Sequence, residues 1–119
     1  MEVLGIPGHT PGAIALLDRK HRCLFSGDSF ASGWPIYMQY PGQDLEKYLN
    51  SMQYMKSLSA EYDTIYPCHG TLALPEGIVD STMECVQGIL EHKFPEKKVA
   101  IWDGSLERAA EYKGVTILY

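Results

Sequence analysis

Three short segments carry the side chains best suited to chemistry. They are Pro-Gly-His-Thr-Pro-Gly around His9, Phe-Ser-Gly-Asp ending at Asp28, and Tyr-Pro-Cys-His-Gly around His69. Glycine and proline fix the backbone in sharp turns, so we expect each of these polar side chains in a rigid loop. Taken one at a time, a structural turn at either histidine, or an Asx-turn or helix cap at Asp28, explains the residue without any chemistry.

Together the three segments indicate a metal site. Each lies beside an expected strand, and the loops at one edge of a sheet can converge. Neutral imidazole and carboxylate are the ligands of catalytic zinc and of non-haem iron. His9, Asp28 and His69 are therefore candidate metal ligands. Cys68 is either a further soft ligand or a small buried residue, and we favour the buried residue.

The elements that position these segments follow from the hydrophobic pattern. Apolar side chains at helical spacing predict helices over residues 44–58, with Asp44 as N-cap, and over residues 75–92. A short third helix is expected over residues 106–112, with Gly114 at its C-terminal end. We expect strands at residues 1–5, 13–18, 22–26, 62–66, 98–102 and 115–119, and a long loop at 27–42. This order predicts an α/β (α+β) fold with one mixed sheet covered on one face by helices.

Composition and charge argue against several classes of function. The 119 residues are enough for a single domain, 1–119, and carry a net charge of −5. An acidic chain does not suit nucleic acid, and no polybasic or membrane-spanning run is present in the sequence. Three cysteines without a C-x-x-C pair, and a start unlike a signal peptide, lead us to expect a reduced, cytoplasmic protein.

The order of the three segments resembles the last three motifs of the metallo-β-lactamase superfamily, and the likeness extends over essentially the whole chain. Cys68 stands where the third motif usually has glycine. The resemblance implies that His9 completes the ligands of a first metal, that Asp28 bridges both metals as the catalytic carboxylate, and that His69 binds the second. The implied metal is zinc, or else iron or manganese, acting on a small-molecule substrate. Trp34, Tyr37 and Tyr40 are either substrate contacts or core cover.

The superfamily signature H-x-H-x-D-H is absent from this sequence. The four histidines are at positions 9, 21, 69 and 92, and His21 and His92 are expected to be solvated. We therefore expect the C-terminal half of the superfamily's αββα sandwich, with an incomplete metal site and little or no hydrolysis by this chain alone. Whether the chain by itself holds a metal stays open.

Half of a sandwich would expose the sheet face that normally packs on the other half. Soluble monomers rarely expose a large apolar patch, so we predict a homodimer through this face, or pairing with a missing N-terminal half. Three functions remain open. They are a hydrolase half-domain active when complemented, a non-catalytic remnant that self-associates or binds a partner, and a mononuclear metal-binding protein.

Overall fold

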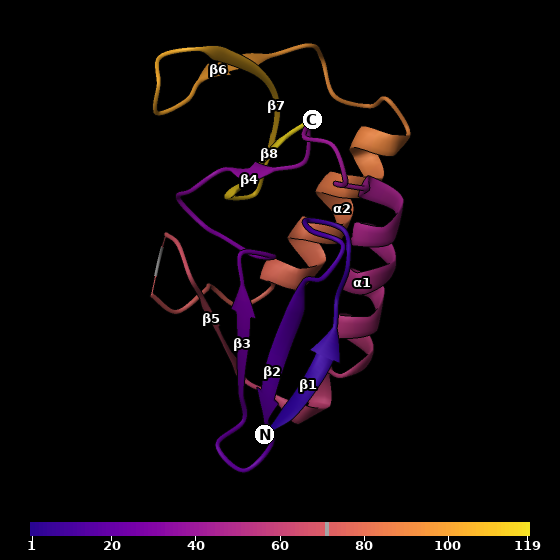
Figure 1. The fold of residues 1–119 in the computed structure, drawn as a ribbon, viewed down its shortest axis with the longest axis vertical. Helices are drawn as coiled ribbons and strands as arrows, with labels where there is room; N and C mark the ends of the chain where they lie inside the picture. Colours follow the sequence, from indigo (N-terminus) through magenta and orange to yellow (C-terminus); the bar gives the residue numbers. More distant parts are fainter. Residues whose placement is uncertain (71) are drawn as a thin grey trace.

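The strands of the computed structural model, which describes residues 1–70 and 72–119, form two four-stranded sheets (Figure 1). The first sheet has the order β1-β2-β3-β5, with β1 at Glu2–Gly5, β2 at Ile14–Asp18, β3 at Cys23–Gly27 and β5 at Thr64–Pro67. Its first three strands are antiparallel neighbours, and β5 pairs with β3 in parallel. Strands β1, β3 and β5 therefore all run in one direction.

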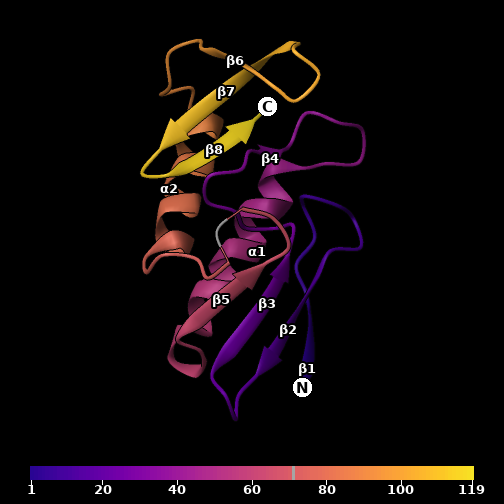
Figure 2. The ribbon, with the colours of Figure 1, turned by 90° about the vertical axis from the view of Figure 1, so that its left-hand side faces the viewer.

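The second sheet has the order β4-β8-β7-β6 and lies beyond the C-terminal ends of β3 and β5 (Figure 2). Its strands are β4 at Ile36–Tyr37, β6 at Lys98–Ala100, β7 at Leu106–Tyr112 and β8 at Val115–Leu118. Strand β4 pairs in parallel with β8, and the other pairs are antiparallel. The expected mixed α/β class is confirmed, but the strands divide between two sheets instead of forming one.

Residues 106–112 form strand β7, so the prediction of a short helix there is wrong. Leucine, glutamate, arginine and alanine favour helices intrinsically, but tertiary context overrides this weak preference. Lys113 and Gly114 have φ angles of 46° and 83°, which suit the two-residue turn of a β-hairpin. Gly114 therefore closes a hairpin between β7 and β8, where we expected it to end a helix.

Helices α1 (Leu45–Ser57) and α2 (Ile78–Leu90) lie on the same side of the first sheet (Figure 1). Asp44 caps α1 as predicted, because its side chain accepts a hydrogen bond from the Lys47 N–H at 3.0 Å. Helix α2 begins later than expected, after a left-handed Gly77. A short 3₁₀ helix, Ser59–Glu61, connects α1 to β5. The described residues include no helix long and apolar enough to cross a membrane.

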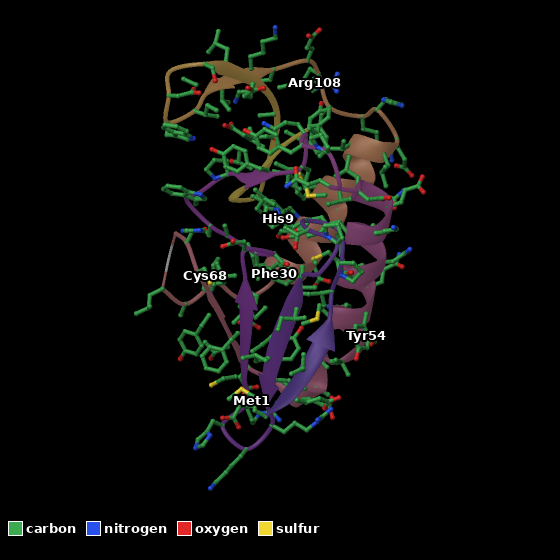
Figure 3. All side chains as sticks on the ribbon, viewed as in Figure 1. Met1, His9, Phe30, Tyr54, Cys68 and Arg108 are labelled. Atoms are coloured by element: carbon green, nitrogen blue, oxygen red, sulfur yellow. The ribbon has the colours of Figure 1, made fainter. Side chains whose placement is uncertain are left out.

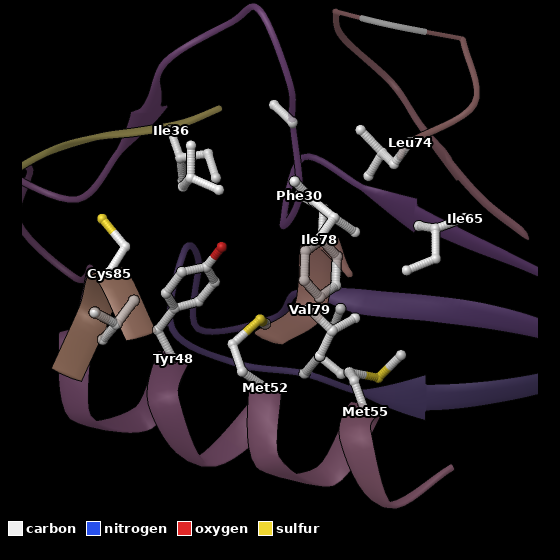
Figure 4. Close-up of a cluster of buried hydrophobic side chains, with 14 of the residues drawn as sticks. Phe30, Ile36, Tyr48, Met52, Met55, Ile65, Leu74, Ile78, Val79 and Cys85 are labelled. Carbon is white, nitrogen blue, oxygen red and sulfur yellow. The ribbon is translucent and has the colours of Figure 1, made fainter. Parts of the chain in front are cut away.

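The core fills the space between the two helices and the first sheet. Tyr48, Met52 and Met55 follow one stripe of α1 and are completely buried (Figure 4). They belong to one cluster with Leu24 and Ile65 of the sheet. This buried cluster holds α1 against the first sheet, and burial of apolar surface is the main stabilising term for such a layer.

The other face of the first sheet is uncovered. Val3, Ile14 and Phe25 are 62%, 50% and 41% exposed. The strand register sets Val3 opposite Leu16, Leu16 opposite Phe25, and Phe25 opposite Tyr66, so these four side chains form one row across the sheet. The exposed face predicted from the sequence therefore exists in the structure of the chain.

Candidate metal centre

Three strand ends bring the candidate ligands to one edge of the first sheet. His9 follows β1, Asp28 follows β3 directly, and His69 follows β5. Because these strands run in the same direction, their C-terminal ends meet, and all three side chains line one cavity of about 340 Å³. Figure 3 shows His9 between the ends of the first sheet's strands and β4. The convergence expected from the sequence is present.

The loop that carries His9 is held by α1. Gly8 has a φ angle of 140°, and a Cβ atom there would lie 2.4 Å from the Cα atom of Tyr48. The Asp44 N–H donates to the Gly8 carbonyl at 3.0 Å, and the Ser51 hydroxyl donates to the Pro7 carbonyl at 2.6 Å. Only glycine fits this close approach, so the N-terminal half of α1 determines where His9 sits.

His9 also has a partner that orients its ring. Its Nδ1 atom lies 3.0 Å from the Tyr37 carbonyl oxygen. Because a carbonyl only accepts, Nδ1 is the donor in this contact, and in the neutral imidazole the lone pair is on Nε2. A backbone carbonyl that fixes the tautomer in this way is the usual second partner of a metal-binding histidine.

Asp28 and His69 contact each other directly. The Asp28 Oδ1 and His69 Nε2 atoms are 3.1 Å apart, and both side chains are about half exposed, at 49% and 53%. The Cys68 N–H donates to the Gly27 carbonyl at 3.0 Å, which fixes the two loops side by side. The Trp34 ring stacks on His69 with centroids 5.5 Å apart. The imidazole is therefore held between a carboxylate and an aromatic ring.

The donor types suit a divalent metal, but the set is incomplete. Imidazole and carboxylate are zinc and iron ligands. Asp28 and His69 form a close pair, and His9 faces the same cavity. In residues 1–70 and 72–119, however, no three histidine, cysteine, aspartate or glutamate side chains are arranged to hold a metal ion. The chain thus presents two neighbouring donors and a third nearby, and a full shell needs further ligands.

The remaining histidines and Cys68 lie away from the cavity lining. His21 is exposed in the β2–β3 turn, where its Nδ1 lies 2.8 Å from an Asp18 carboxylate oxygen. His92 is exposed just after α2. Both positions are as expected. Cys68 is exposed, so the prediction of a buried residue is wrong. Cys68 comes directly after Pro67, the last residue of β5, and lies in the exposed loop that carries His69.

Aromatic side chains line much of the cavity. Trp34, Tyr37 and Tyr40 are among the lining residues, and Trp34 and Tyr40 are 45% and 51% exposed. The sequence left open whether these aromatic residues contact a substrate or cover the core. The structure favours a place in the cavity lining over a place in the core. Trp102, in the turn between β6 and β7, joins them. Its contribution was missed because the pairing of β6 with β7, which carries it there, was not predicted.

The family model for the metallo-beta-lactamase superfamily matches residues 1–69, the segment that contains His9, Asp28 and His69. The chain belongs to the metallo-beta-lactamase superfamily. The resemblance seen in the sequence is thereby confirmed at the level of the superfamily. The matched segment contains the whole first sheet and α1, and it ends at His69.

Solved structures show the same fold. A metallo-beta-lactamase from Pontibacter korlensis has 18% identity and a TM-score of 0.61, over 72% of this chain and 40% of that chain. FIM-1 from Pseudomonas aeruginosa, in its mono-zinc form, has 21% identity and a TM-score of 0.59, over 75% of this chain and 38% of that chain. The chain therefore spans about 40% of the length of the solved structures it matches.

Proposed function

We propose that this chain supplies part of the metal centre of a metal-dependent hydrolase, which becomes active when the remaining ligands are present. One observation carries the proposal. His9, Asp28 and His69 follow three strands that run in the same direction and line one cavity, where Asp28 and His69 are 3.1 Å apart. The superfamily membership supports the same function.

Each of the three residues has a distinct role in this proposal. The Tyr37 carbonyl keeps the proton of His9 on Nδ1, so Nε2 is the atom that would bind a metal. The Asp28 carboxylate supplies negative charge beside His69. A divalent metal held there would lower the pKa of a bound water and polarise the scissile carbonyl or phosphoryl group of a small substrate. Zinc is the metal we favour over iron or manganese, because one of the similar structures is a mono-zinc form.

Elemental analysis of the purified chain, after chelation and reloading with zinc, tests this proposal. We expect roughly one bound metal per chain, lost when His9, Asp28 and His69 are all replaced by alanine. The matched control replaces Asp18, His21 and His92, which have the same side-chain types at sites away from the cavity. Absence of metal in the folded wild-type chain, or equal loss in both variants, would refute the proposed ligand set.

A second experiment tests activity. We expect little hydrolysis by the chain alone, and hydrolysis of small esters or thioesters when a polypeptide carrying H-x-H-x-D-H is supplied together with it. Complementation that fails although both polypeptides bind each other and zinc would argue against a hydrolase.

The uncovered sheet face favours a second function, self-association or partner binding without catalysis. Val3, Leu16, Phe25 and Tyr66 form an apolar row on the side of the sheet away from the helices. We propose that a second copy of the chain covers this row when the rest of the sandwich is absent. Symmetric pairing of the same face on two copies buries the row on both. In a longer protein, the missing half would take that place.

A further inference from the structure

We propose that the aromatic end of the cavity binds an organic cation, such as the trimethylammonium group of a choline-like compound. The substrate of the hydrolase would then carry this cation at one end and the scissile bond at the other. The claim about a substrate rests on the proposed function. Binding of the cation itself needs only the side chains of this chain.

Four aromatic side chains from separate parts of the chain line the cavity. Trp34 belongs to the loop after β3, Tyr37 to β4, Tyr40 to the loop after β4, and Trp102 to the β6–β7 turn. The rings of Tyr37 and Tyr40 stack with centroids 5.9 Å apart. Large exposed aromatic surfaces gathered around a cavity are costly in water unless a ligand covers them, so this gathering indicates a binding surface.

The charges near these rings are negative. Among the lining residues that the structure describes, none is lysine or arginine, and Asp28 is acidic. Asp103 directly follows the lining residue Trp102, so a second carboxylate belongs to the turn that carries this ring. Across residues 1–70 and 72–119, no basic group lies within ion-pair distance of Asp103 or Glu107. Neither carboxylate is therefore neutralised by an ion pair.

The strand register places Glu107 on the same face of the second sheet as Tyr37. Tyr37 is paired with Leu118, and Leu118 with Ala109, so these residues share one face of the second sheet. Glu107 is two residues from Ala109 along β7 and therefore lies on the same face. Asp103 is in the turn beside Trp102, where its carboxylate accepts a hydrogen bond from the Ser105 N–H at 2.9 Å.

Aromatic faces and unpaired carboxylates together select a cation. The negative face of an aromatic ring attracts an ammonium group, and desolvation inside an aromatic cage strengthens the attraction. An anionic group would meet no basic partner here. A neutral group would pack on the rings, and the carboxylates would then have no function in binding. A cavity of about 340 Å³ has room for a trimethylammonium group and the ester attached to it.

The two tryptophans make this site directly observable. Trp34 and Trp102 are the only tryptophans in the sequence, and both line the cavity. The experiment titrates choline into the full chain at constant ionic strength and follows tryptophan fluorescence. The comparison ligand is 3,3-dimethylbutan-1-ol, which has the same shape with a carbon in place of the charged nitrogen. We expect a saturable change with choline, at an affinity about fivefold to thirtyfold tighter than the neutral alcohol.

Two sets of variants locate the site. Trp102→Leu should weaken choline binding severalfold, whereas Tyr54→Leu, which removes an exposed ring from α1, should leave it unchanged. Asp103→Asn with Glu107→Gln should weaken choline binding and leave the alcohol unaffected. The asparagine keeps an oxygen for the Ser105 N–H, so the turn should stay folded.

Equal affinity for choline and the alcohol, tighter binding of the alcohol, or no response to either ligand would overturn the cation site. The metal measurement is independent, because this titration uses metal-free protein. Choline binding without zinc binding would refute the proposed ligand set and keep the cation site. Zinc binding without choline binding would refute the cation site and keep the proposed ligand set.

Discussion

The two histidines of the candidate site depend on the glycines beside them. Gly8 brings the His9 loop into contact with the backbone of α1. Gly70, just after His69, has a φ angle of 84°, and a Cβ atom there would lie 2.4 Å from the Ser32 carbonyl oxygen. The position of each imidazole therefore depends on a backbone contact that no other residue type permits.

Replacing Gly70 by alanine should destabilise the chain and disturb His69. We expect a loss of about 2–4 kcal/mol, because left-handed strain adds to the clash with the Ser32 carbonyl. Gly104→Ala is the matched control, since Gly104 has a φ angle of 83° and open space around it, and should cost only the strain. Urea unfolding measures both variants. Equal losses would show that the contact with Ser32 does not hold the loop.

Cys85 and Cys68 should differ sharply in reactivity. Burial raises the pKa of the Cys85 thiol from 9.0 to about 12, whereas Cys68 is exposed. Since the thiolate is the reactive form, iodoacetamide at pH 8 should modify Cys68 and leave Cys85 intact until the chain unfolds. Peptide mass spectrometry measures both sites. Rapid labelling of Cys85 in the folded chain would contradict this burial.

The same raised pKa makes stability depend on pH on the alkaline side. The fold keeps the Cys85 thiol neutral, while the unfolded chain ionises it above its ordinary pKa of 9.0. The contribution is therefore complete below about pH 9 and is lost as the pH rises toward 12. The wild-type chain should lose more stability between pH 8 and pH 10 than Cys85→Ala does, as measured by urea unfolding. Equal losses of stability in the wild-type chain and in Cys85→Ala would exclude the thiol as the cause.

Among the elements, α1 connects the core to the site. Its buried stripe packs on the first sheet, and the loop of His9 is hydrogen-bonded to Asp44 at the N-terminus of α1 and to Ser51 in its middle. The Asp44 side chain caps the helix, while the Asp44 N–H holds the Gly8 carbonyl. This end of α1 therefore affects both the stability of the fold and the position of the candidate ligand His9.

Asp44→Ala should cost about 1 kcal/mol of unfolding free energy, because the Lys47 N–H loses its acceptor. Asp44→Asn, which keeps an acceptor oxygen, should cost much less. Chemical denaturation followed by circular dichroism at 222 nm measures both. A similar loss in the two variants would mean that charge, and not the hydrogen bond, stabilises this end of α1.

At the scale of the whole molecule, the outer face of the first sheet stays uncovered in the part of the chain that the structure describes. The helices bury the inner face of the first sheet, and Phe25, in the middle of the outer row, stays 41% exposed. The length of the similar structures supports the same view, because this chain covers only 40% of the first of them.

Light scattering at micromolar concentration should show a dimer of the wild-type chain and a monomer of Phe25→Lys. Charge in the middle of the row makes burial against a second copy unfavourable. Tyr54→Lys is the control, since Tyr54 is 42% exposed on the outer side of α1, and it should leave the dimer intact (Figure 3). A monomeric wild-type chain would refute pairing through this face.

Several features could be predicted from the sequence alone because they depend on local chemistry. The apolar spacing and Asp44 were sufficient to predict α1, and the order of the three segments around His9, Asp28 and His69 was sufficient to predict the superfamily. Glycines and prolines beside the histidines marked rigid loops. For the helix and the loops, residues close in sequence determine the outcome through propensity, capping or turn geometry, whereas the superfamily followed from the resemblance of the three segments to known motifs.

Other features were decided only by contacts between distant residues. Residues 106–112 became a strand because β6 and β8 pair with them, against their own preference for a helix. The same pairing brought Trp102 to the cavity, and the exposure of Cys68 depends on how the loop after β5 lies on the folded chain. Strand pairing and cavity lining join segments far apart in the chain, and such contacts gain their free energy only once the whole fold has assembled.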